Sequence, residues 1–289
     1  MTDWLDVLLD NIGADRLTRV VDVGANPIDR PPYQTLLERS GCTLWGFEPQ
    51  KKAYEALQSS KSEREFYFPY AVGDGTRKTL HLYRDSGLVS TFEASEAALG
   101  FLGRSRANIK LKDKFEVETV RLDDIEEIDR FDLLKIDIQG GEVAVFEGAA
   151  EKLSRAVAVV TEVRFYPLYE GEPMLGGVDE ALRGLGFQFH KFLFTKSKVL
   201  PSRQIDRLKR ANHRNQLIDG DAVYLRDLGR PDEISSEDLK HLAVLAASVF
   251  ESHDLVLHCL DHLVARGAVS PDLSAAYVEA LPEELKKSA

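Results

Sequence analysis

The sequence predicts an α/β fold, built on one seven-stranded and mostly parallel sheet and followed by a small all-helical extension. From Arg19 onward, short β-branched segments alternate with segments of helical periodicity, which is the pattern of strands joined by crossover helices. The last two strand-like segments follow each other with no helix between them, which predicts a terminal strand pair. Beyond residue 230 the strand signals stop and only helical periodicity continues.

Seven segments carry the strand signal of the sheet, because they are short, apolar and rich in Val, Leu, Ile and Phe. In chain order they are residues 19–24, 43–49, 65–75, 131–142 with its Gly-Gly turn, 156–163, 187–194 and 221–227. An extra pair of strands is expected at 79–83 and 115–122. The polar stretch 86–113 between them is long enough to form a lid or a binding loop.

Helical segments alternate with these strands and then make up the extension. Within the sheet region they are residues 35–41, 51–60 and 178–187, and beyond it residues 235–250, 254–267 and 270–281. Gly41 is expected to end the first of them as a C′ glycine. Ser235 and Asp238 are spaced as a capping box, and Ser270 is expected as an N-cap before Pro271.

These boundaries divide the chain into an N-terminal helix (1–18), a sheet domain (19–230) and a helical extension (231–289). The extension is expected to serve in packing, or as the contact of a homodimer.

Composition excludes several classes of partner. The net charge of -11 argues against general affinity for nucleic acid or an anionic membrane, and no apolar run is long enough to span a bilayer. The N-terminus lacks a signal-peptide pattern, and Cys42 and Cys259 fit no metal or redox spacing. The sequence therefore predicts a cytoplasmic protein with inert thiols and neither a nucleic-acid nor a membrane partner.

One local exception to the acidic balance lies at residues 201–216. The cations clustered there are Arg203, Arg207, Lys209, Arg210 and Arg214. The simpler interpretation is a solvated helix face. The functional one is a dock for an anionic acceptor, such as a phosphorylated or nucleotide-linked sugar.

Polar and small residues gather at the ends of the first four predicted strands. In open parallel sheets a ligand lies beyond these carboxyl ends. In strand order the residues are Asp22, Gly24, Ala25 and Asn26; Glu48; Ala71, Val72 and Asp74; and Asp137, Gln139 and Glu142. Because carboxylates packed closely repel one another, the pattern favours a ligand or cation that receives them.

The spacing of Glu48 points to an adenosine-containing ligand. It lies about two dozen residues past Gly24, where an acid at the end of the second strand accepts ribose hydroxyls. A dinucleotide also needs backbone N–H groups for its pyrophosphate, and Pro27, Pro31 and Pro32 remove such donors. S-adenosylmethionine contains no phosphate, so it fits this turn better.

The motifs taken together resemble those of the FkbM-type S-adenosylmethionine-dependent methyltransferases, a branch of the seven-stranded class I fold. In chain order they are VVDVGAN, GFEP, PYAVGD, VRLDDI, LLKIDIQGGEVAVFEGA and VVTEV. The resemblance implies an O-methyltransferase acting on hydroxyls of sugars, glycans or small molecules. The cofactor residues it implies are Asp22, Gly24, Ala25 and Asn26 at the methionine end, Glu48 at the ribose, Ala71 and Val72 at the adenine, and Asp137 beside the sulfonium.

Methyl transfer to a hydroxyl needs a group that removes the proton. The candidate catalytic residues are Asp137, Glu162 and His190, with Glu162 favoured. The alternatives are that Glu162 is tied to Arg164 and that His190 is structural. Gln139 stands where the family usually has an acid. Three oxygen ligands from Asp137, Gln139 and Glu162 would suit a divalent cation, which is the less favoured interpretation.

Substrate contacts are expected from Gln139, Ser90 and Tyr166, the last by stacking on a sugar face. Two rival functions remain open. A nicotinamide-dependent oxidoreductase is disfavoured by the missing glycines, and a non-catalytic cofactor-binding or scaffold protein is suggested by Gln139 and the altered turn.

Overall fold

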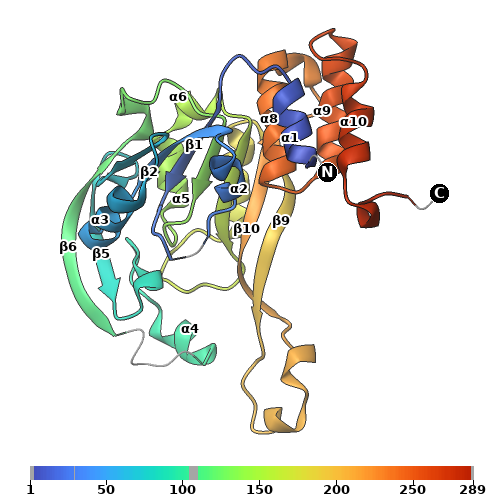
Figure 1. The fold of residues 1–289 in the computed structure, drawn as a ribbon. Coiled ribbons are helices and arrows are strands. Elements are labelled where there is room, and N and C mark those ends of the chain that lie inside the picture. The colour runs from blue at the N-terminus through green and yellow to red at the C-terminus, as the bar shows by residue number, and fades with distance from the viewer. Residues whose placement is uncertain (1–2, 29, 104–109, 288–289) are drawn as a thin grey trace.

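The computed structural model describes residues 3–28, 30–103 and 110–287 and centres on one seven-stranded sheet (Figure 1). The strand order is β3-β2-β1-β7-β8-β10-β9, in which β10 runs antiparallel to both of its neighbours and the first five are parallel. The strands are β1 (Thr18–Val23), β2 (Cys42–Phe47), β3 (Glu65–Phe68), β7 (Leu133–Ile136), β8 (Ala158–Arg164), β9 (Phe187–Lys198) and β10 (Gln216–Arg226). The predicted fold class and the terminal strand pair are confirmed.

The third predicted strand, 65–75, is wrong in its second half. β3 ends at Phe68, one residue before Pro69, which has no N–H to donate to a sheet ladder. Ala71 and Val72 instead form β4 (Ala71–Val72) of a second sheet with order β4-β6-β5. The other two strands of that sheet, β5 (Arg77–Tyr83) and β6 (Leu111–Val120), are antiparallel and confirm the expected extra pair.

The stretch between β5 and β6 is partly helical. It contains a 3-10 turn, η1 (Ser86–Leu88), and a helix, α4 (Glu96–Phe101), whose N-cap Ser95 accepts a hydrogen bond from the Ala98 N–H. Residues 104–109 of the predicted lid lie outside the described residues. Its described part packs Leu88 and Leu99 in a small apolar cluster with Tyr169.

One face of the main sheet is covered by α5 (Glu142–Glu147), α6 (Ala150–Leu153) and α7 (Leu175–Gly184), which bury Val145, Leu153 and Leu182. α2 (Gln34–Glu38) buries Leu36 on the opposite face, and α3 (Lys51–Ser60) lies beside β3. The expected role of Gly41 is wrong, because Ser40 adopts the left-handed conformation after α2, at φ 58°. Gly41 instead gives room, since a Cβ there would lie 2.5 Å from Leu36 Cδ1.

The opposite face is completed by helices from both ends of the described chain (Figure 1). These are α1 (Trp4–Asn11), α8 (Ser236–Ser248), α9 (His253–Ala265) and α10 (Leu273–Ala280), and α1 packs against both α8 and α10. Leu8 of α1 and Leu242 of α8 share one buried cluster with Val20, Leu44 and Val223 of the sheet. The helices therefore cover the sheet instead of standing apart from it.

Local signals at the helix starts have mixed outcomes. Ser235 Oγ accepts a hydrogen bond from the Asp238 N–H at 3.1 Å and donates one to Asp238 Oδ2 at 2.7 Å, which confirms Ser235 as the N-cap and Asp238 as its partner. The Ser270 N-cap is wrong, because α10 begins at Leu273 after a turn in which the Leu273 N–H bonds the Ser270 carbonyl.

Candidate active site

The acidic side chains at the carboxyl edge of the sheet share one face of it. Side chains alternate along a strand, so Asp22 of β1 and Glu162 of β8 lie on the same face as the buried Val20 and Val160. In the strand register, Asp22 is opposite Lys135 and Glu162 is opposite Asp221. On this face of the sheet, the acidic side chains therefore lie directly next to the buried apolar side chains of the same strands.

The turn after β1 brings the backbones of three strands together. The N–H groups of Gly24 and Ala25 both donate to the Phe47 carbonyl, at 3.0 and 3.1 Å. Gly24 has φ +88°, and a Cβ at this position would lie 2.1 Å from the Asp137 carbonyl oxygen. Only glycine fits such a close approach, and the half-buried Asn26 follows directly at the edge of the sheet.

Asp22 is held by protein groups. The Tyr33 hydroxyl donates to Asp22 Oδ2 at 2.5 Å, and Lys135 Nζ lies 3.2 Å from Oδ1. Burial opposes the charge on Lys135, yet the Asp22, Asp137 and Asp221 carboxylates raise its pKa. Asp22 therefore fixes the turn through Tyr33 and pairs with Lys135, while its buried Oδ1 accepts no hydrogen bond from the described residues.

Glu48 follows β2 and is 2% exposed. Its Oε1 accepts a hydrogen bond from the Gln50 N–H at 2.7 Å. Burial raises the pKa of Glu48 to about 7, assisted by Asp22 and opposed by the Gln50 N–H. The site thus keeps a carboxyl group whose ionised form is poorly stabilised by the protein alone.

Gln139 connects the two catalytic candidates. Its Nε2 donates to Asp137 Oδ1 and to Glu162 Oε2, both at 2.8 Å. Its Oε1 accepts from Arg164 Nη2 at 2.6 Å and from the Tyr169 hydroxyl at 3.1 Å. Gln139 has φ 62°, an uncommon left-handed conformation for a residue other than glycine, and these contacts hold it there.

Arg164 balances part of the negative charge. It lies 2.7 Å from Glu162 Oε1, 3.2 Å from Glu172 Oε2 and 3.3 Å from Asp219 Oδ2, and these carboxylates raise its pKa against the effect of burial. Glu172 also accepts hydrogen bonds from the Leu168 and Tyr169 N–H groups. The sequence alternative that ties Glu162 to Arg164 is thus present in the structure, together with the bond from Gln139.

The carboxyl groups at this edge have different proton affinities. Burial, and then the neighbouring Asp137 carboxylate, raise the pKa of Glu162 well above its ordinary value. Burial acts in the same direction on Asp137, but Lys135 and the interactions with Glu162 and Gln139 outweigh it and lower the pKa. Burial and Asp137 raise the pKa of Asp221 to about 6. Asp137 therefore loses its proton more readily than Glu162, and the ionised Glu162 is the stronger base of the two.

Comparison with known proteins agrees with this geometry. Residues 22–189, more than half of the chain, match the methyltransferase FkbM domain. The chain belongs to the FkbM methyltransferase family. It is an S-adenosylmethionine-dependent methyltransferase, and the matched residues include the turn after β1, Glu48 and the Asp137–Gln139 segment.

Solved structures similar to this FkbM-family chain are remote. Magnesium protoporphyrin IX methyltransferase from Synechocystis PCC 6803, with bound SAM, is 10% identical with a TM-score of 0.39, over 78% of this chain and 75% of that one. A putative S-adenosylmethionine-dependent methyltransferase from Listeria monocytogenes is 10% identical with a TM-score of 0.38, over 77% and 95%. No curated protein matches the chain. The family assignment therefore rests on residues 22–189.

The structure does not bring His190 to this cluster. Its Nε2 lies 3.0 Å from Ser252 Oγ, and its ring lines a separate indentation of about 380 Å³ with Asp254 and His258 of α9. Burial lowers its pKa. The ring belongs to the contact between β9 and α9, so the structural alternative holds and His190 has no place among the catalytic residues of this FkbM-family site.

Ala71 and Val72 are also displaced from their predicted position. They lie in β4, paired with Thr119 and Val120 of β6, instead of at the end of a strand in the main sheet. The Val72 side chain is buried in the apolar cluster between the main sheet and the helices α5, α6 and α7. The chain leaves the main sheet at Pro69, which has no N–H for the ladder, and the backbone of this pair is joined to β6 instead.

Two expected substrate residues have protein partners. Ser90 is 1% exposed, donates to the Gln139 carbonyl at 2.5 Å and accepts from the Phe92 N–H at 2.9 Å. Tyr166 is half-buried and stacks on the exposed Phe101 of α4, with ring centroids 5.3 Å apart. Ser90 thus fastens the loop before α4 to the Gln139 turn, whereas Tyr166 and Phe101 form an aromatic pair beside it.

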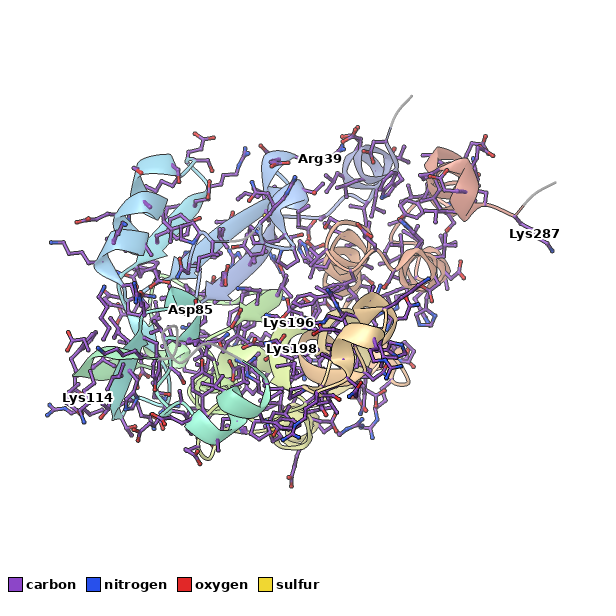
Figure 2. All side chains as sticks on the ribbon, turned by 90° about the horizontal axis from the view of Figure 1, so that it is seen from below. Arg39, Asp85, Lys114, Lys196, Lys198 and Lys287 are labelled. Carbon is purple, nitrogen blue, oxygen red and sulfur yellow. The ribbon has the colours of Figure 1, made fainter. Side chains whose placement is uncertain are left out.

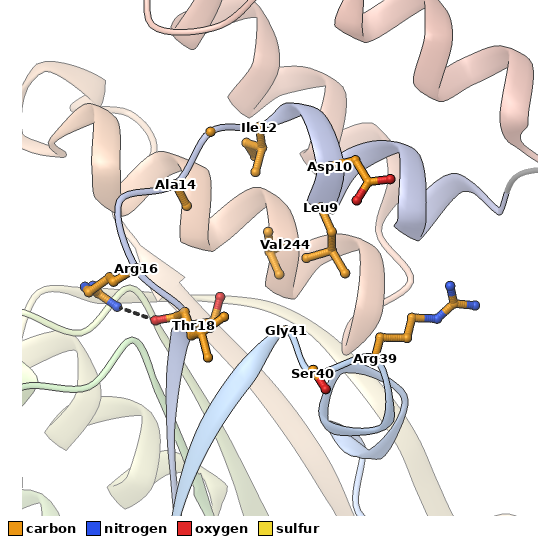
Figure 3. Close-up of a pocket in the computed structure, with 12 residues that line it drawn as sticks. Leu9, Asp10, Ile12, Ala14, Arg16, Thr18, Arg39, Ser40, Gly41 and Val244 are labelled. Atoms are coloured by element: carbon orange, nitrogen blue, oxygen red, sulfur yellow. Dashed lines mark hydrogen bonds between the residues drawn. The ribbon is translucent and has the colours of Figure 1, made fainter. Parts of the chain in front are cut away.

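A larger cavity lies away from these acids (Figure 3). It measures about 500 Å³ and is enclosed by α1, the start of β1, the end of α2 and Val244 of α8. Because Thr18 and Gly41 line it, it lies at the amino-terminal edge of β1 and β2, opposite the carboxyl ends. Within the described residues no three His, Cys, Asp or Glu side chains converge as a metal site, and no helix could cross a membrane.

Sequence reasoning missed the residues that organise the site. Lys135 could have been found, because a lysine inside an otherwise apolar central strand needs a buried acid as partner. Tyr33 and Glu172 come from segments whose sequence carries no such signal. Tyr169 is expected from the sequence to stack on a sugar face with Tyr166, but its hydroxyl instead donates to Gln139 Oε1.

Proposed function

We propose that this methyltransferase transfers a methyl group from S-adenosylmethionine to a hydroxyl of a sugar, a glycan or a small metabolite. One observation carries the proposal: at the carboxyl edge of the sheet, Gln139 Nε2 donates hydrogen bonds of 2.8 Å both to Asp137 Oδ1 and to Glu162 Oε2. One carboxylate of the pair is suited to face a cation and the other to accept a proton.

The residues present fit this cofactor. The acids at the edge outnumber Lys135 and Arg164, so a ligand with a sulfonium and an ammonium group meets complementary charge. The Gly24 turn leaves no room for a side chain at the closest backbone approach. Glu48 offers a carboxyl whose ionised form gains from ribose hydroxyl donors. Asp22 contributes by holding the turn through Tyr33 and Lys135.

When bound, S-adenosylmethionine supplies an electrophilic methyl group. The ionised form of Glu162 accepts the proton of the attacking hydroxyl. Because burial raises its pKa, this carboxylate binds a proton more strongly than an ordinary one does, and the hydrogen bonds that both its oxygens accept from Gln139 and Arg164 favour the ionised form. Arg164 and Gln139 fix its two oxygens, so the base is oriented before the acceptor arrives. Asp137, whose pKa is lowered, stays ionised and faces the positively charged sulfonium.

Calorimetry with S-adenosylhomocysteine and with NADH separates this proposal from the oxidoreductase alternative. We expect the homocysteine nucleoside to bind and NADH not to bind, and Glu48→Ala to weaken nucleoside binding at least tenfold. Tight NADH binding without nucleoside binding would overturn the proposal.

Transfer itself is measured with labelled S-adenosylmethionine and fractionated pools of glycans and metabolites. Glu162→Gln should lower the rate by about 10²–10⁴-fold while S-adenosylhomocysteine still binds, because the amide keeps the shape and removes the base. His190→Gln is the control and should retain the rate. Nucleoside binding with no labelled ether in any pool would favour the scaffold alternative.

A further inference from the structure

The β9–β10 hairpin projects past the rest of the molecule, on the same side as α4 (Figure 1). Its strands pair from Phe187–Arg226 to Lys198–Gln216, and residues 199–215 form the connecting loop. The predicted helix face at 201–216 is wrong. The loop contains only two short 3-10 turns, η3 (Ile205–Arg207) and η4 (Arg210–Asn212), and its side chains are almost all exposed.

The loop is the basic part of an acidic protein. It carries Arg203, Arg207, Lys209, Arg210 and Arg214 against one acid, Asp206, in a chain of net charge -11. Arg210 pairs with Asp206 at 2.6 Å. In the described part of the chain, Arg203, Lys209 and Arg214 make no ion pair. The positive charge of the loop is thus available to an outside anion.

The strand β10 connects the loop to β8, the strand that carries Glu162. Asp221 of β10 is opposite Glu162, and β10 begins five residues earlier at Gln216. At about 3.4 Å per residue, the loop begins about 17 Å beyond the carboxylates. A single sugar ring is far shorter than this span, so a molecule that reaches both places must be extended.

The stem of the hairpin carries two lysines that have partners in the protein. Lys196 and Lys198 both belong to β9 (Figure 2), and Lys196 Nζ lies 4.0 Å from Asp219 Oδ2. Lys198 Nζ donates to the Leu102 carbonyl at 3.0 Å, which joins the stem to the end of α4. The Phe101–Tyr166 stack therefore lies near the stem, and an aromatic face suits a saccharide ring.

We propose that the acceptor is an extended saccharide bearing a phosphate or pyrophosphate group, and that the loop 199–215 binds this group while the saccharide reaches Glu162. This inference rests on the proposed function and narrows its acceptor class. Arginine suits the role because its planar guanidinium matches phosphate oxygens with two parallel hydrogen bonds.

The test uses the full chain with inorganic pyrophosphate and UDP-N-acetylglucosamine as probes, by calorimetry at 50 and 200 mM salt. The variant Arg203→Gln/Arg207→Gln/Arg214→Gln should weaken binding of both probes at least tenfold. The matched control is a second triple variant, Arg77→Gln/Arg183→Gln/Arg230→Gln, which replaces three exposed arginines outside the loop. It changes the net charge equally and should leave binding within twofold of wild type.

S-adenosylhomocysteine is titrated in parallel and should bind all three proteins equally. If it binds and neither probe does, the loop inference is overturned while the proposed function stands. Equal losses in the variant and the control would also overturn it, because binding would then be non-specific. Failure of the nucleoside itself to bind wild type would remove the proposed function instead.

The loop also exposes Leu200 and Leu208, so a membrane is the rival occupant. Sedimentation with vesicles of phosphatidylcholine and phosphatidylglycerol separates the two. Vesicle capture that needs the three arginines, with no binding of either soluble probe, would replace the saccharide with a lipid surface. Binding of the soluble probes without vesicle capture supports the inference.

Discussion

Replacing Glu48 by Gln should stabilise the ligand-free protein at alkaline pH and remove its affinity for the cofactor. Glu48 is buried, and its pKa is raised from 4.5 to about 7 in the folded chain. A raised carboxyl pKa adds stability at low pH, and that stability is lost as pH rises through the folded value. The wild type therefore loses stability between about pH 4.5 and pH 7, and Glu48→Gln does not.

The size of the effect follows from the two pKa values. Each tenfold difference in proton affinity corresponds to about 1.4 kcal/mol, so the gap from 4.5 to about 7 amounts to about 3 kcal/mol in full. Between pH 5 and pH 8 the variant should gain about 2–3 kcal/mol relative to wild type. For a chain of this size that corresponds to roughly 3–5 °C in Tm.

Thermal and urea unfolding at pH 5 and pH 8 measure this gain. Glu55→Gln, an exposed carboxylate on α3, is the matched control and should show no pH-dependent gain. In the same buffers, S-adenosylhomocysteine affinity of the wild type should fall about tenfold per pH unit below 7, because binding needs the carboxylate. A stability difference between Glu48→Gln and wild type that is equal at both pH values would refute the reasoning.

Three further substitutions test the packing around the site. Gly24→Ala should lower the free energy of unfolding by at least about 1–3 kcal/mol in urea, because its Cβ would meet the Asp137 carbonyl oxygen at 2.1 Å. Lys135→Met should cost about 3–5 kcal/mol by leaving Asp22 buried without its cation, and adding Asp22→Asn should recover part of it; additive losses would contradict the pairing. Ser235→Ala should cost about 1 kcal/mol in the same assay, and an unchanged midpoint would speak against the cap.

The parts of the fold that could be predicted are those with a local pattern. The strands of the main sheet follow from runs of apolar residues, and the Ser235 N-cap follows from spacing alone. The break after Phe68 could have been predicted too, because Pro69 has no N–H for the ladder. That the chain then joins a second sheet depends on pairing with Thr119 and Val120, some 48 residues later, which no local signal encodes.

The sequence predicts which residues gather at the candidate site, but not which hydrogen bonds join them. The rule that ligands lie beyond parallel strand ends selects Glu48, Asp137 and Glu162 from the sequence. It does not show that Gln139 adopts a left-handed conformation and bonds both catalytic candidates. His190 was placed wrongly because strand position alone does not tell which side of β9 meets α9.

The covering of the main sheet by α8 and α9 has a consequence for the order of folding during synthesis. Val20, Leu44 and Leu133 belong to strands made early, whereas α8 begins only at Ser236. Until the ribosome has made that helix, this apolar face of the growing sheet is covered only in part, by α1 and α2, and the rest is exposed to chaperones or to other nascent chains. Premature termination after β10 would therefore yield an aggregation-prone sheet and not a smaller enzyme.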